Sequence, residues 1–148
     1  MELAEGPCPH TPDIGDDSTV ICPGFVDPHV HLPQFAILGT NGESLLAWLS
    51  NTAFPEEMRW ENVDYALEKA EWAITQMYRY GTTTFAGFLT SHHDSATAVM
   101  RWCQSRGVSA CLGQVLQDCN SPSELQRPTD DQLQELQLQL KQFPPGGR

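Results

Sequence analysis

The clearest periodic pattern in the chain runs from Glu61 to Tyr80. Apolar residues recur there at steps of three and four positions and form one stripe along a helix: Val63, Ala66, Leu67, Ala70, Ile74, Met77 and Tyr78. Arg79 stands in the last turn, where a cation suits the helix dipole, and Gly81 follows as a stop signal. The pattern therefore predicts a long amphipathic helix over residues 61–80.

Three other runs are rich in β-branched and aromatic residues, which is typical of strands. They cover residues 19–31, 82–89 and 108–116. We expect the first to be a buried strand that ends near His31, with a break at Pro23-Gly24. Residues 1–18 contain prolines and acids without any period, so an irregular tail is expected there.

Weaker helical periods cover residues 43–49, 95–106 and 129–143. Thr129 and Gln132 have the spacing of a capping box, which predicts where the last helix begins. That helix is expected to bury a leucine seam: Leu133, Leu136 and Leu140. Residues 32–41 are expected to form a loop, and Pro55 is expected to break the chain.

Strands and helices thus alternate in the order β-α-β-α-β-α. Crossovers of helical length between strands imply parallel pairing with right-handed connections. No G-x-G-x-x-G or G-K-[ST] motif follows a strand, so the usual signal for binding nucleotide phosphates is missing. The order predicts an α/β fold, either a doubly wound sheet or part of a (β/α)8 barrel.

Composition narrows the classes of partner. The 148 residues include eight Lys+Arg against nineteen Asp+Glu, a formal net charge of −11. Nucleic acid and anionic membrane are poor partners for such a chain, because both require a basic face. There is no apolar run near the ~20 residues of a membrane-spanning helix, and no signal-peptide pattern. Five cysteines without C-x-x-C spacing indicate free thiols, so we expect a cytoplasmic protein.

The candidate chemistry lies at the end of the first predicted strand. His29 and His31 are two residues apart, so both imidazoles should point to the same face. Two such imidazoles can bind one divalent transition metal, and active sites of α/β folds lie at this end of the strands. Asp27 on the same face could orient an imidazole. The alternative is that a bare H-x-H is a coincidence on a half-buried strand.

The residues around this pair resemble a known signature. The segment PGFVDPHVH, residues 23–31, resembles the first-strand motif of the metal-dependent amidohydrolase superfamily. The resemblance then narrows to the guanine deaminase family. Its further matches are Pro33-Gln34-Phe35, LLAWL at 45–49, TAFPE at 52–56, GTTT at 81–84 and Thr90-x-His92-x-Asp94-Ser95. The similarity covers about residues 20–140.

The resemblance implies a set of roles and a partial fold. His29 and His31 would be the first two Zn²⁺ ligands, and Gln34 would hydrogen-bond the purine through its amide. The reaction would be hydrolytic deamination of guanine to xanthine and ammonia, a step of purine catabolism. Residues 19–148 would form the N-terminal part of a TIM (β/α)8 barrel, about its first three βα units.

The same resemblance sets expectations about what the chain lacks. The acid/base residues and the remaining metal ligands are expected beyond the end of the chain, so we expect no catalytic acid or base here and an inactive fragment when it stands alone. A homodimer of the complete enzyme is left open. His92 falls either at the rim of the site or in a loop as a hydrogen-bonded histidine.

Two other functions remain open from the sequence. The chain could belong to another amidohydrolase that acts on a different cyclic substrate, in which Gln34 does not read guanine. It could also be a non-catalytic half-barrel.

Overall fold

The computed structural model describes residues 15–16, 18–40, 42, 44–144 and 146, so most of the predicted tail, residues 1–18, lies outside the described residues. Three strands form one sheet: β1 (Phe25–His31), β2 (Thr82–Phe88) and β3 (Ser109–Gly113). They lie in the order β1-β2-β3, and both pairs are parallel. The predicted α/β fold with parallel strands is therefore confirmed.

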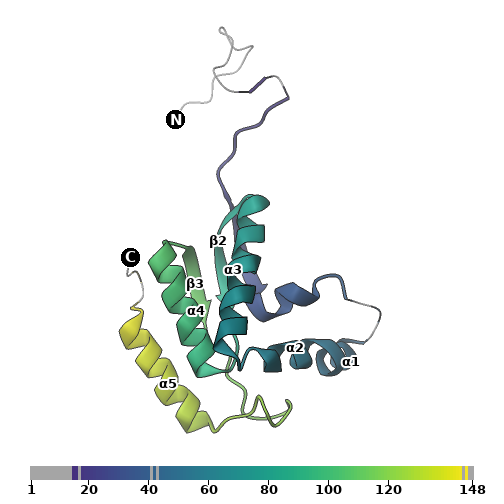
Figure 1. Ribbon diagram of the computed structural model, residues 1–148, viewed down its shortest axis with the longest axis vertical. Coiled ribbons are helices and arrows are strands. Elements are labelled where there is room, and N and C mark those ends of the chain that lie inside the picture. Colours follow the sequence, from purple (N-terminus) through teal and green to yellow (C-terminus); the bar gives the residue numbers. More distant parts are fainter. Residues whose placement is uncertain (1–14, 17, 41, 43, 145, 147–148) are drawn as a thin grey trace.

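Three long helices follow the prediction closely. They are α3 (Val63–Arg79), α4 (His93–Arg106) and α5 (Thr129–Gln142). Helices α3 and α4 lie next to each other over one face of the sheet, and α5 lies on the far side of α4 (Figure 1). The C-cap of α4 is Gly107 with φ +66°, a left-handed conformation that glycine adopts without a steric cost. Within the described residues, we find no helix with the length and apolar character needed to cross a membrane.

The segment between β1 and α3 is more helical than expected. Residues predicted as a loop form a 3₁₀ helix, η1 (Leu32–Ile37). The predicted break at Pro55 is wrong, because α1 (Leu45–Trp48), the π-helical turn η2 (Leu49–Ala53) and α2 (Phe54–Arg59) follow one another without interruption. Pro55 stands in the first turn of α2, directly after the wider π turn. At that position its missing N–H and fixed φ disturb the helix least.

The expectation of a buried first strand is also wrong. The strand begins only at Phe25, and the side chains of Phe25 and Val26 are 57% and 66% exposed. Among the described residues, β1 pairs only with β2 and therefore lies at an edge of the sheet. The third strand is shorter than predicted as well, since regular pairing with β2 ends at Gly113.

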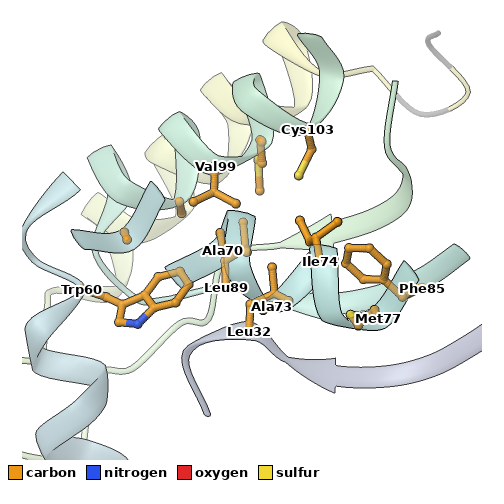
Figure 2. Close-up of a cluster of buried hydrophobic side chains, with 13 residues drawn as sticks. Leu32, Trp60, Ala70, Ala73, Ile74, Met77, Phe85, Leu89, Val99 and Cys103 are labelled. Carbon is orange, nitrogen blue, oxygen red and sulfur yellow. The ribbon is translucent and has the colours of Figure 1, made fainter. Parts of the chain in front are cut away.

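One hydrophobic core lies between the sheet and the helices. Figure 2 shows Phe85 of β2 pointing toward α3, and Val99 and Cys103 of α4 facing the same space. Phe85 is 1% exposed and Val99 is fully buried. Four members of the predicted stripe of α3 are buried together with one more alanine: Ala66, Ala70, Ala73, Ile74 and Met77. The other predicted members are less buried than expected, since Val63 and Leu67 are half-buried and Tyr78 is 43% exposed. Helices α3 and α4 thus hold the sheet from one side.

Helix α5 turns a different face inward than the sequence predicts. Leu133 and Leu140 of the predicted seam are 43% and 52% exposed, whereas Gln132 and Gln139 are buried. The Gln132 amide accepts from the backbone N–H of Gln117 at 2.8 Å and donates to the carbonyl of Arg127 at 2.7 Å. These bonds replace the expected capping box, since the N-cap of α5 is Pro128 and has no side-chain bond.

Candidate functional site

The two histidines of the H-x-H motif lie side by side at the carboxyl end of β1. Their ring centroids are 5.2 Å apart, and both rings pack against Phe88 at the end of β2. Phe88 stacks on His31 at 4.7 Å with an interplanar angle of 16°. The predicted placement of both imidazoles on one face of the strand is confirmed, and that face is the one that α3 and α4 leave open.

A local irregularity in β1 accompanies this arrangement. The pairing register with β2 shifts between Asp27 and Val30, where Pro28 provides no backbone N–H. The Asp27 carboxylate accepts the backbone N–H of His29 at 3.0 Å. Asp27 therefore supports the backbone of the motif rather than orienting an imidazole, which differs from the expected role.

The surroundings of His31 favour its neutral ring. Partial burial, with a smaller contribution from the neighbouring His29, lowers the pKa of His31. Neutral imidazole is the form that binds a metal ion. The donor set therefore fits a transition metal as two of its ligands. Within the described part of the chain, no group of three or more His, Cys, Asp or Glu side chains gathers around a common point.

Gln34 lies beside this pair because η1 starts directly after β1. It lines, together with His31, a hollow of about 160 Å³. The other lining residues come from the α1–α2 segment and from the chain after β3: Leu49, Ala53, Phe54, Glu57, Val115 and Gln117. A wider hollow of about 350 Å³ lies near the start of α5, among residues 118–129, and contains neither Gln34 nor either histidine. The smaller hollow is the candidate substrate site because the predicted chemistry gathers there.

Glu57 is the residue of this hollow that the sequence analysis missed. Its side chain is 7% exposed, and burial raises its pKa from the usual 4.5 to about 7 despite hydrogen bonds from the Thr90 hydroxyl and the Ser91 backbone. A helical period was present as a signal: Ala53 and Trp60, four positions before and three after Glu57, are both buried. The expected break at Pro55 concealed that period.

His92 stands at the N-cap of α4, behind the end of β2. Its backbone N–H donates to the Thr90 hydroxyl at 3.3 Å, and burial lowers the pKa of its ring. Its Nε2 is buried and has no hydrogen-bond partner among the described residues. His92 does not line the hollow that contains His31 and Gln34.

Comparison with known proteins places this chain in a family. Residues 20–144 match the Amidohydrolase family. The chain is 35% identical over 129 residues to the guanine deaminase of Escherichia coli and 34% identical over 117 residues to that of Rattus norvegicus. These matches cover 87% and 78% of this chain, but only 29% and 26% of the relatives.

Solved structures agree with the sequence relatives. The fold superposes on E. coli guanine deaminase with a TM-score of 0.80, at 35% identity, over 85% of this chain and 29% of that one. The guanine deaminase of C. acetobutylicum, solved with guanine in its active site, also gives a TM-score of 0.80, at 32% identity, over 84% of this chain and 30% of that one. The chain spans less than a third of the length of these relatives, and by its sequence match and its fold it belongs to the amidohydrolase family.

Proposed function

We propose that this chain contributes the first part of the active site of a guanine deaminase, an enzyme that hydrolyses guanine to xanthine and ammonia in purine catabolism. The observation that carries the proposal is the meeting of His31 and Gln34 in one hollow, next to His29. The relatives that match this part of the chain are guanine deaminases, which favours guanine over other cyclic substrates.

His29 and His31 would hold a zinc ion, with further ligands from outside the described residues. Catalytic zinc sites use three protein ligands and an open position, and imidazole is a common member of that set. When bound, zinc supplies a Lewis acid that makes water a nucleophile near neutral pH. The stacked ring of Phe88 shields one side of His31 and holds its orientation.

Gln34 would bind the purine. An amide presents one donor group and one acceptor group, which matches a base edge that carries an N–H beside a carbonyl. The side chain is half-buried in the hollow, so a hydrogen bond to the base is protected from water. Its role is to orient the base relative to the histidine pair.

The three parallel strands would be the first strands of a (β/α)8 barrel. The helices over one face and the open second face, with the histidines at the carboxyl end of β1, support this arrangement. The free thiols of Cys22, Cys103, Cys111 and Cys119 are typical of a reducing compartment and support the proposal of a cytoplasmic enzyme. Whether the complete enzyme forms a homodimer is a matter for solution measurement.

The proposal is tested with the protein expressed from its complete coding sequence. We expect ammonia and xanthine from guanine, and about one zinc per protomer by elemental analysis. The double variant His29→Ala/His31→Ala should lose both the metal and the activity. Absence of ammonia release from guanine by the zinc-loaded wild type would overturn the substrate, and unchanged zinc in the double variant would overturn the ligands.

Residues 1–148 expressed by themselves should show no guanine deamination, because the two imidazoles leave zinc short of a catalytic ligand set. The measurement is xanthine formation at protein concentrations and times that reveal slow turnover. Measurable xanthine from residues 1–148 would show that the described part of the chain already contains a working site.

A further inference from the structure

Two consecutive buried carboxylates of α2 differ in how their oxygens are used. Glu56 is 6% exposed, and both of its oxygens are occupied: Oε2 accepts from Arg59 at 2.9 Å, and Oε1 accepts from the Tyr65 hydroxyl at 2.6 Å. Glu56 does not line the hollow. It serves as an internal anchor between α2 and α3.

Glu57 is equally buried but only half satisfied. The Thr90 hydroxyl and the Ser91 backbone lie near its carboxyl group and lower its pKa, but less than burial raises it. Its Oε1 is buried and has no hydrogen-bond partner among the described residues. A buried acceptor without a donor is costly, and native proteins rarely keep one without a ligand, a water or a role in chemistry.

The position of Glu57 indicates what kind of ligand would donate a hydrogen bond to this carboxylate. Its side chain lines the same hollow as Gln34 and His31, while Leu49, Phe54 and Val115 supply apolar walls. A flat heterocyclic base suits such a hollow, with its ring against the apolar walls and its polar edges against Gln34 and Glu57. A side chain that burial already holds in place costs little reorganisation when the base binds.

We infer that Glu57 is a further substrate-binding residue, whose Oε1 accepts a hydrogen bond from a ring or amino N–H of the base held by Gln34. The inference rests on the proposed function and extends it, because guanine carries several N–H donors that the Gln34 amide alone does not satisfy. The role is binding and orientation of the base; no bond to Glu57 is made or broken.

The test compares Glu57→Gln with the matched variant Glu56→Gln in the protein expressed from its complete coding sequence. The amide replacement keeps the shape of the side chain and exchanges one acceptor oxygen for an amide donor. We expect kcat/KM for guanine to fall about ten- to a hundredfold in Glu57→Gln, mainly through KM, with zinc content unchanged. Glu56→Gln should keep KM for guanine within about twofold.

A second variant guards against misfolding. Glu57→Asp keeps the charge but withdraws it from the hollow, and it should raise KM in the same direction. A wild type that deaminates guanine while both Glu57 variants keep its KM would overturn this inference and leave the proposed function standing. A wild type that neither binds nor deaminates guanine would overturn both.

Discussion

The two faces of the three-stranded sheet are built from alternating residues of the same strands, yet they have opposite environments. On the face covered by α3 and α4, Phe85 is 1% exposed and belongs to the core. On the other face, Phe88 is 40% exposed and packs against His29 and His31. Two phenylalanines three positions apart in β2 therefore have different roles. Phe85 stabilises the core, and Phe88 packs against the histidine pair.

The contrast shows how a strand can combine stability with chemistry. Successive side chains of a strand point to opposite faces, so a core residue and a site residue can follow one another without conflict. The covered face is packed with apolar side chains and excludes water. The open face carries polar side chains, namely imidazoles, hydroxyls and a thiol. They belong to His29, His31, Thr84, Ser109 and Cys111.

The largest expected effect is on the free energy of unfolding, in a comparison of two single variants that each remove one aromatic ring, one from each face of the sheet. Phe85→Ala should lower the free energy of unfolding by about 3–5 kcal/mol, because it leaves a cavity in a packed core. Phe88→Ala should cost about 1 kcal/mol or less, since its ring is partly in water. Chemical denaturation of the two variants measures the difference. Equal losses would show that the open face is as tightly packed as the covered one.

Glu57 lines the hollow beside His31, and its raised pKa predicts that the stability of the fold depends on pH. Its folded pKa of about 7 lies above the ordinary 4.5, so the folded state holds its proton more tightly. The proton on Glu57 contributes its full stabilisation of the fold below pH 4.5. As the pH rises to 7, this contribution to the free energy of unfolding falls by about 3 kcal/mol. Relative to Glu57→Gln, the wild type should therefore lose stability over this range.

Denaturation of both proteins at several pH values between 4.5 and 7 checks this difference. Glu56→Gln, which retains Glu57, should keep most of the wild-type slope, because the charge of Glu56 is the smallest of the causes that shift the pKa of Glu57. The comparison between wild type and Glu57→Gln is needed because the lowered pKa values of His31 and His92 act in the opposite direction, toward greater stability as the pH rises to 6.5. Parallel curves for wild type and Glu57→Gln would contradict the raised pKa.

The last prediction concerns two thiols on opposite faces of the sheet. Their labelling should differ strongly in rate, with the smallest effect on the stability of the fold. Cys103 is 3% exposed on α4, and burial raises its pKa to about 12, whereas Cys111 is exposed on β3. A water-soluble disulfide reagent should label Cys111 rapidly and Cys103 only after unfolding. Mass spectrometry of labelled peptides distinguishes the two, and rapid labelling of Cys103 in the folded protein would show that the covered face opens readily.

The parts of the fold predicted well are those with a local cause. The stripe of α3 and the glycine after α4 depend on residues within a few positions of each other, and both were found within two residues of their observed bounds. The α5 seam failed because hydrogen bonds to distant backbone groups, such as those of Gln132 to Gln117, outweighed its apolar period. The expected break at Pro55 failed because a π turn accommodates the proline.

The sequence by itself determined the alternation of strands and helices and the common face of His29 and His31, because backbone geometry links residues that are a few positions apart. Only the tertiary structure decided that β1 is exposed at the edge and that Glu57 reaches the hollow of His31 and Gln34. The physical reason is that α2 must fold back beneath the end of the sheet before its carboxylates acquire different partners. Contacts with residues distant in the sequence distinguish the two carboxylates, namely Tyr65 for Glu56 and Thr90 for Glu57.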